Sequence, residues 1–478
     1  MFISFIIITF IAAVLAYTVR INKYNHLISI VYSLLVAAFS VYEYQHLGET
    51  QLVFFTPDAL GIIFLFILGL LGFFTASQYR FYAYKRKEYP SNVANHNAAY
   101  VLFLGALVGL NLTNHFGLLW AFVEATTLTG SILIYHDRNK FALEAVWKYI
   151  FVASISIALA FAGILFLSIG LQELGEVELS FEEIQKVASL LDPIWLKASF
   201  LFILTGFSVK MGIFPMFSVD IDAKDTSPSP VGAMFSSVLM NAGFLAIFRF
   251  YVAFSHAEIQ PWMNHILMIV GFASIFFAAS YLIRVKNYKR IFAYSSMEHA
   301  GLITLAISMG SKAGYIAAIL HIIFHSFVKA GIFYQLGQVA YTFKTKLLDQ
   351  AGGYLYLNPA GGLVLILGLL SIVGFPPSGL FVSEFLIFKS FIVGGHIWLV
   401  ITVMLMLALI MYTLADNVLR LIFITPKNMT QVDINATKLV SKWESLSQLF
   451  LIGLTMYLGF AQPDFLMDLI NEAVALLS

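Results

Sequence analysis

The sequence contains no cysteine and few charged residues, and each scarcity excludes a class of protein. Without cysteine, the chain has no disulfide, no cysteine-ligated zinc and no cysteine-ligated iron–sulfur cluster. Charged residues occupy only 11% of the 478 positions, whereas a soluble domain usually has about a quarter. The 27 basic and 26 acidic residues nearly balance, so no overall basic field indicates binding to nucleic acid.

Motifs for chemistry are also missing. The sequence has no nucleophile beside a base, no glycine-rich phosphate loop and no metal cage. We therefore expect no cofactor, no resident metal and no catalytic redox site in this chain. His321 and His325 stand four residues apart, as two metal ligands on a helix do, but no HExxH carboxylate accompanies them.

Apolar residues are abundant, and they recur in runs. They make up 60% of the chain, in stretches of about 20 residues, a pattern typical of an all-α polytopic membrane protein. The run 2–17 follows no basic residues and precedes no small-residue cleavage site, so it predicts a membrane helix instead of a removed signal peptide. In all, the sequence predicts about 14 spans, at 2–19, 27–43, 58–76, 97–113, 115–135, 145–170, 196–217, 228–251, 262–283, 293–310, 313–341, 357–392, 397–423 and 446–464.

The loops between these spans predict the orientation. Every second loop is basic, from the loop with Arg20 and Lys23 to the loop with Lys427, Lys438 and Lys442, while the opposite loops hold few basic residues and the acidic segment 173–183. Basic loops face the cytoplasm in most membrane proteins. We therefore expect an inner (plasma) membrane protein with both termini outside the cytoplasm.

Three titratable residues share one face of the predicted span 313–341. His321, His325 and Lys329 fall at i, i+4 and i+8, so on a helix they form a polar stripe about 12 Å long. Such groups inside a membrane usually face the bundle interior or a water-filled cavity. Histidine suits proton transfer near neutral pH because its ordinary pKa lies near 6.5.

Isolated charges occur in other apolar runs, at Glu124, Lys210 and Glu384. Each alone is equally consistent with a structural polar group, and Glu384 with a plain partner for Lys389 or Lys329. Lys148 adds another candidate, although a local pair with the residue four positions earlier also explains it. All these residues together, in so apolar a chain, favour a proton or ion path.

Two spans contain breaks. Pro215 lies beside Gly206 and Gly212, and Pro376 and Pro377 lie between two glycines. Proline removes a helical hydrogen bond, and non-helical backbone at membrane depth survives only inside protein or along a cavity. The breaks fall in spans 7 and 12, an odd offset, which predicts two inverted five-helix repeats, spans 4–8 and 9–13. The expected division is 1–96, 97–251, 252–423 and 424–478.

Several polar segments together carry a family resemblance. They are WAFVE (120–124), KMGIFP (210–215), SPSPV (227–231), KRIFAYSS (289–296) with Glu298 and His299, HSFVKA (325–330) and GFPPSGLFVSE (374–384). Over nearly its whole length the chain resembles the antiporter-like subunits of respiratory complex I, Mrp-type cation/proton antiporters and group 4 membrane-bound hydrogenases, above all component F of hydrogenase-4. The resemblance implies a 14-helix inverted-repeat fold. It also implies a coupled Glu124–Lys210 pair, a central His325 with Lys329, and a terminal Glu384.

The chain departs from the family pattern at three positions. Complex I subunits often have a histidine where Ser236 stands, and the family commonly has histidines where Phe217 and Lys224 stand. The segment 217–224, entering span 8, is therefore altered, which affects how protons enter and which partner docks there.

These features predict a proton-translocating subunit, or one exchanging protons for Na⁺, in a complex-I-like or group 4 hydrogenase-like oxidoreductase complex. Its expected partners are other membrane subunits, soluble iron–sulfur or hydrogenase-like subunits and the lipid bilayer, with no nucleic acid. One alternative is a redox-free transporter, either an Mrp-type antiporter or an inorganic-carbon uptake complex. Another is a scaffold that keeps the fold without transport, because fold alone does not fix function.

Overall fold

The computed structural model describes residues 1–175, 177–426 and 442–477, and the described residues contain helices and no strands. The helices are α1 (Phe2–Thr18), α2 (Asn22–Gln45), α3 (Ala59–Arg86), α4 (Pro90–Leu112), α5 (Phe116–Ile134), α6 (Lys140–Leu171), α7 (Phe181–Val187), α8 (Pro193–Met211), α9 (Ser218–Thr226), α10 (Ser229–Met234), the π-helical turn η4 (Phe235–Leu239), α11 (Met240–Ala253), α12 (Gln260–Leu282), α13 (Tyr288–Ser308), α14 (Lys312–Phe343), α15 (Tyr354–Leu357), α16 (Pro359–Ile372), α17 (Gly379–Val393), α18 (Ile397–Phe423), α20 (Lys442–Phe460) and α21 (Asp464–Ala475). Part of the predicted loop 424–445 lies outside the described residues.

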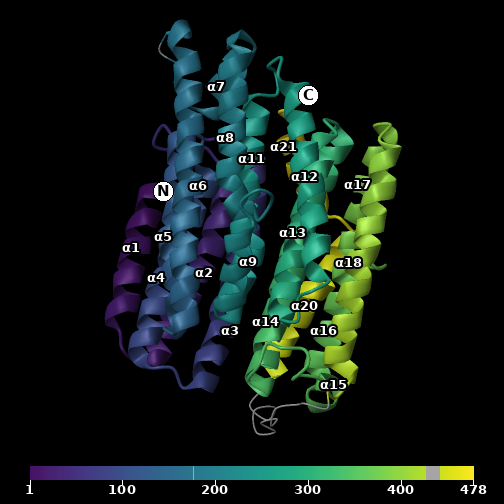
Figure 1. Ribbon diagram of the computed structural model, residues 1–478. Helices are drawn as coiled ribbons and strands as arrows, with labels where there is room; N and C mark the ends of the chain where they lie inside the picture. The colour runs from purple at the N-terminus through teal and green to yellow at the C-terminus, as the bar shows by residue number, and fades with distance from the viewer. Residues whose placement is uncertain (176, 427–441, 478) are drawn as a thin grey trace.

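The long helices lie side by side in one bundle (Figure 1). Helices α1–α6 occupy one side of the bundle, and α16–α20 occupy the other. Among the described residues, ten helices are long and apolar enough to cross a membrane, and the pair α20 and α21, bent by 74°, makes a further candidate. This confirms the predicted all-helical, polytopic membrane protein.

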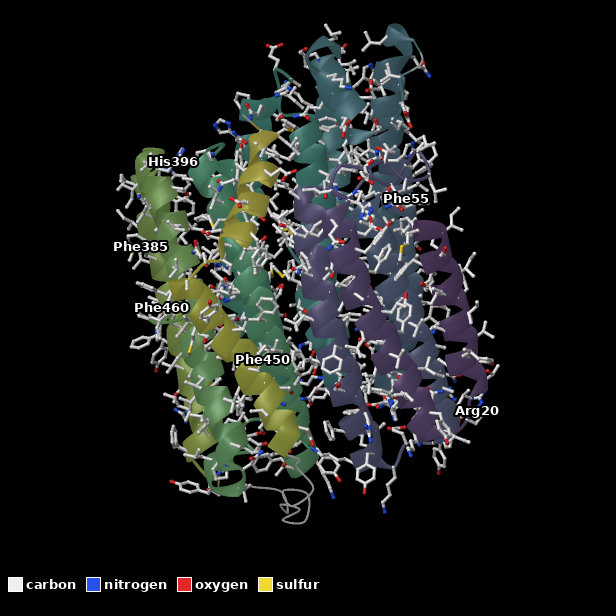
Figure 2. The ribbon with its side chains drawn as sticks, turned by 180° about the vertical axis from the view of Figure 1, so that it is seen from behind. Arg20, Phe55, Phe385, His396, Phe450 and Phe460 are labelled. Atoms are coloured by element: carbon white, nitrogen blue, oxygen red, sulfur yellow. The ribbon has the colours of Figure 1, made fainter. Side chains whose placement is uncertain are left out.

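Burial differs sharply between central and outer helices. In the most apolar stretch of α14, 94% of the residues are buried, and in that of α10–α11 all of them are. A helix enclosed all round directs even its polar side chains into protein. Outer helices expose large apolar side chains instead, among them Phe10 and Val14 on α1 and Leu405 on α18. Figure 2 shows labelled aromatic residues of this kind, Phe385 and Phe460, on the outside of the bundle.

The helices are interrupted at both predicted positions. Helix α8 ends at Met211, and residues 212–217, with Pro215, are non-helical before α9 begins. Residues 373–378, which include Pro376 and Pro377, separate α16 from α17. A glycine with positive φ allows each turn, since Gly212 has φ +74° and Gly374 has φ +63°.

Small residues bring α6 and α8 into close contact. A Cβ atom built on Gly206 of α8 would lie 2.5 Å from the Ala160 Cβ and 2.6 Å from the backbone nitrogen of Ala160. On α6, a Cβ built on Gly163 would lie 2.8 Å from the carbonyl oxygen of Ser199 in α8. Glycine thus permits backbone approach at this interface, as small residues do in many membrane helix pairs. The contact fixes α8, which carries Lys210.

We predict that Gly206→Ala destabilises the protein by about 1–3 kcal/mol, because the added methyl group overpacks the α6–α8 contact. Thermal unfolding in detergent should show a lower midpoint temperature. Gly453→Ala is the matched control, since a Cβ there meets nothing within 4 Å. Equal midpoints for both variants would contradict the close α6–α8 contact.

Candidate functional site

Lys210 lies in the last turn of α8 and is almost fully buried, with 1% of its surface exposed. Its Nζ donates a hydrogen bond to the Tyr149 hydroxyl of α6 at 2.9 Å. The same ammonium lies 5.0 Å from the centre of the Tyr149 ring. A tyrosine that holds a lysine inside an apolar bundle was not predicted, because the sequence around Tyr149 shows only another aromatic residue on an apolar helix.

Glu124 lies on α5 and is half-buried. Its Oε1 accepts a hydrogen bond from Ser154 Oγ at 3.2 Å, while Oε2 is buried and has no hydrogen-bond partner among the described residues. Within the described part of the chain no ion pair joins Glu124 to Lys210, although the charge of Glu124 acts on Lys210.

Lys148 differs from the other candidates, because half of its side chain (51%) is exposed on the isolated chain. Its Nζ lies 2.6 Å from Glu144 Oε1 on the same helix and 3.9 Å from Asp222 Oδ2. The local pair, which was the alternative from sequence, is present. The structure does not bring Lys148 into the buried group.

The three predicted residues of α14 are completely buried, and α13 supplies a partner that was not predicted. His321 Nε2 lies 2.9 Å from His299 Nδ1 of α13, and His321 Nδ1 lies 2.9 Å from Ser383 Oγ of α17. His325 has its ring 5.1 Å from that of His299, and neither of its ring nitrogens has a hydrogen-bond partner among the described residues. His299, His321 and Ser383 thus form a hydrogen-bonded row that crosses from α13 through α14 to α17.

Lys329 lies one turn beyond His325. Its Nζ donates to the backbone carbonyl of Phe292 in α13 at 2.8 Å. The buried carboxylate of Glu298, also on α13, acts on Lys329 through its charge. Glu298 and His299 are among the residues that carry the family resemblance. The sequence alone did not place their side chains in the same group as Lys329.

Glu384 lies on α17, shortly after the α16–α17 break. The carboxylate and the ring nitrogens of His299 and His321 offer atoms that all lie within 4.8 Å of one another. A Cβ on Gly374 would lie 2.1 Å from Glu384 Oε2, so the glycine of the break makes room for the carboxylate. Within the described residues neither Lys389 nor Lys329 forms an ion pair with Glu384.

This group has the geometry to bind a cation, but its hydrogen bonds favour proton chemistry. Both ring nitrogens of His321 already take part in hydrogen bonds, to His299 and to Ser383. A neutral imidazole donates from one nitrogen and accepts at the other, so the row can pass a proton from ring to ring. A carboxylate at its end supplies an acceptor.

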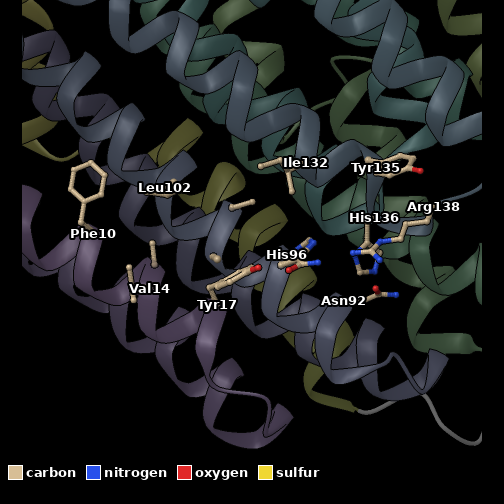
Figure 3. A pocket seen from close by; sticks show the side chains of 14 residues that line it. Phe10, Val14, Tyr17, Asn92, His96, Leu102, Ile132, Tyr135, His136 and Arg138 are labelled. Atoms are coloured by element: carbon tan, nitrogen blue, oxygen red, sulfur yellow. The ribbon is translucent and has the colours of Figure 1, made fainter.

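A cavity of about 440 Å³ lies elsewhere, between α1, α4 and α5, and contains none of the predicted path residues. Figure 3 shows its apolar side chains, such as Phe10 and Leu102, on one side, and the polar group of His96, His136 and Arg138 on the other. Next to it, His136 Nε2 lies 3.6 Å from Glu88 Oε1. This contact holds the pKa of the Glu88 carboxyl, between α3 and α4, below its usual value. The candidate path is instead packed inside the bundle.

Comparison with known proteins identifies the family of this chain. A model of the membrane-spanning family "NADH:quinone oxidoreductase/Mrp antiporter, TM" matches residues 113–411, more than half of the chain. This chain belongs to that family. The matched residues include Glu124, Lys210, Lys329 and Glu384, and membership confirms the resemblance found from sequence.

The relatives span several kinds of complex. The chain is 33% identical over 345 residues to a hydrogenase-4 component F homolog of Methylacidiphilum infernorum, covering 70% of this chain and 72% of that protein. Its fold is similar to a chain of the archaeal membrane-bound sulfane sulfur reductase (TM-score 0.85, 21% identity, 99% of this chain and 96% of that one). It is also similar to a chain of the Mrp complex from Dietzia sp. DQ12-45-1b (TM-score 0.81, 16% identity, 98% and 95%).

We predict that Tyr149→Phe destabilises the protein by about 1.5–3 kcal/mol, because it removes a hydrogen bond to the buried ammonium of Lys210. Thermal unfolding of the purified chain should report the loss. Tyr457→Phe, at a tyrosine that is 59% exposed, is the control and should leave the midpoint unchanged. If Tyr149→Phe unfolds like the control, the Tyr149–Lys210 bond is not a stabilising contact.

Proposed function

We propose that this chain translocates protons across the membrane as one subunit of a larger complex. The proposed path runs from Glu124 and Lys210 in the first half of the family region, through His325 and Lys329, to His321, His299 and Glu384. The single observation that carries the proposal is the buried row His299–His321–Ser383, with Glu384 beside it. Titratable groups are rare inside membrane helix bundles, and substrate or ion pathways and proton relays are among the sites that they mark.

Unpartnered polar atoms along the same route support the proposal. Among the described residues, Glu124 Oε2, both ring nitrogens of His325, His299 Nε2 and Glu298 Oε2 are buried without a hydrogen-bond partner. A buried polar atom that lacks a partner costs about 1–3 kcal/mol. Water molecules that connect these groups would remove that cost and would also carry protons between them.

We further propose that the chain crosses the membrane 14 times, with inverted repeats at 97–251 and 252–423, an N-terminal segment 1–96 and a C-terminal segment 424–478. The two helix interruptions, α8–α9 and α16–α17, support this division, since each falls in the corresponding span of one proposed repeat. In this arrangement the chain lies in the plasma membrane, and both of its termini lie outside the cytoplasm.

We expect that this chain does not drive transport by itself. Similar chains come from a sulfane sulfur reductase complex and from an Mrp complex, so the fold fits both redox-driven and redox-free assemblies. The relative at 33% identity is a hydrogenase-4 component F homolog, which favours a complex with soluble iron–sulfur or hydrogenase-like subunits. The alternative is a redox-free Mrp-type antiporter or inorganic-carbon uptake complex, which the likeness to the Mrp chain supports.

Lys210→Met and Glu384→Gln should each lower proton transport at least tenfold while the complex still assembles, because each removes one proton-carrying group from the path. Transport would be measured as a pH change in inverted membrane vesicles, and assembly by native gel electrophoresis. Lys389→Gln, on the same helix as Glu384, is the matched control and should transport normally. Wild-type transport in both path variants would refute the proposed path.

Purification from native membranes in mild detergent, followed by mass spectrometry, distinguishes the two kinds of complex. We predict that hydrogenase-like or quinone-reductase-like subunits with iron–sulfur proteins co-purify with the chain. Recovery of only small membrane subunits, or of one large soluble zinc protein, would contradict the redox-driven assignment and support the redox-free transporter.

A further inference from the structure

Most of the altered segment 217–224 belongs to helix α9, and this helix contains a buried ion pair. Asp220 and Lys224 are 3% and 1% exposed, and Lys224 Nζ donates directly to Asp220 Oδ2 one turn away. From sequence, a charged segment of this kind would ordinarily be a solvated loop. Burial of both charges, between two halves of a membrane protein, needs a physical reason, because a buried pair is weak evidence for added stability.

The pair lies directly against the end of α8, the helix that carries Lys210. A Cβ on Gly212 would lie 2.6 Å from Asp220 Oδ2 and 3.8 Å from Lys224 Nζ. A side chain at this position would therefore displace the pair. The free carbonyl groups at the C-terminal end of a helix also favour a nearby cation, here Lys224.

The charges of the pair act on both halves of the proposed path. Asp220 acts on Lys210, and Lys224 acts on His325 and Lys329. Helix α9 accordingly packs against α6 and α8 on one side and against α13 on the other. A contact of Arg290 Nη2 on α13 with Asp222 Oδ1 at 2.7 Å ties α9 to the second half.

The titratable and charged groups that face the pair come from several elements. Besides Lys210, Tyr149 of α6 feels the charge of Asp220. Nearby, Lys289 of α13 is buried and donates to the Ser227 carbonyl at 2.8 Å, just after α9. Lys224 lies on α9, which packs against the turn η4, and η4 in turn packs against α14.

The position where complex I subunits often carry a histidine holds no titratable group in this chain. Ser236 lies in the π-helical turn η4, is completely buried, and its Oγ has no hydrogen-bond partner among the described residues. Asn241, one turn further along, accepts from Ser326 Oγ of α14 at 2.9 Å. Turn η4 packs against both α9 and α14. The chain therefore lacks a proton carrier on η4 while a buried ion pair lies on the neighbouring α9.

We propose that Asp220 and Lys224 are a further proton-carrying station, which connects Lys210 to the His325–Lys329 group in place of the histidine absent at position 236. The Lys210 ammonium releases a proton to the Asp220 carboxylate. The Lys224 ammonium gives its proton, through water beside Ser236, to the neutral imidazole of His325. Neutral Lys224 then takes the proton held by Asp220, which restores the ion pair. One proton has moved from Lys210 to His325, and this inference rests on the proposed function.

The test replaces both partners at once with neutral residues of similar shape, Asp220→Asn with Lys224→Gln. Loss of both charges leaves no unpaired buried charge, so the fold should tolerate the change. The expected result is at least a tenfold lower rate of proton transport in inverted membrane vesicles of the intact complex. The matched control is Lys85→Gln with Glu444→Gln, a similarly buried ion pair 2.6 Å long that lies away from the path. It should keep at least half of the rate.

Rescue separates proton transfer from a structural role. Adding Ser236→His to the Asp220→Asn/Lys224→Gln variant places an imidazole on η4, and transport should recover at least threefold. A structural defect on α9 would not recover in this way.

Three outcomes would overturn the inference: normal transport in the Asp220→Asn/Lys224→Gln variant, an equal loss in the Lys85→Gln/Glu444→Gln control, or no recovery with Ser236→His. The proposed function is tested separately by Lys210→Met and Glu384→Gln. If those two variants lose transport while the Asp220→Asn/Lys224→Gln variant keeps it, the path stands and only the additional station fails.

Discussion

The cost of removing charge from water is the constraint on which the rest of this structure depends. Inside the bundle a lysine ammonium without a partner is costly, because the surrounding side chains are mostly hydrocarbon. Lys210 has Tyr149 as its partner, Lys329 a backbone carbonyl, and Lys224 the carboxylate of Asp220. Each of these bonds joins different parts of the chain or stands at a helix break. The hydrogen bonds of these buried lysines therefore help to determine how the central helices pack.

The two helix interruptions are only partly enclosed by protein. Gly212, Ile213 and Ser378 are buried, whereas Pro215, Phe375, Pro376 and Pro377 are exposed on the isolated chain. Each interruption also places a positive-φ glycine against a carboxylate, Gly212 against Asp220 and Gly374 against Glu384. Glycine is needed for both reasons, because a side chain there would strain the backbone and collide with the acid. Both breaks thus lie next to acidic residues of the proposed proton path.

Much of this organisation follows from the sequence, and the reasons for the remainder are physical. Apolar runs predict the helices, and isolated charges such as Lys210 and Lys329 stand out because burial of an unpartnered charge is costly. Tyr149 and His299 were not found, because an aromatic residue on an apolar helix and a histidine in a polar segment have no distinctive spacing. Asp220 and Lys224 were not recognised as a buried pair, because two charges in an altered segment do not indicate burial, and only tertiary packing buries them. Lys148 stays a prediction for the path; its nearest carboxylate, Glu144, lies on the same helix, and half of its side chain is exposed.

Proton movement by the assembled complex is the measurement that tests the central claim most directly. The intact complex would be reconstituted into liposomes with a trapped pH-sensitive dye, and its driving reaction or ion gradient would be started in the external buffer. The account predicts a change of internal pH that a protonophore abolishes. A working, fully assembled complex that changes the internal pH no more than empty liposomes would contradict it.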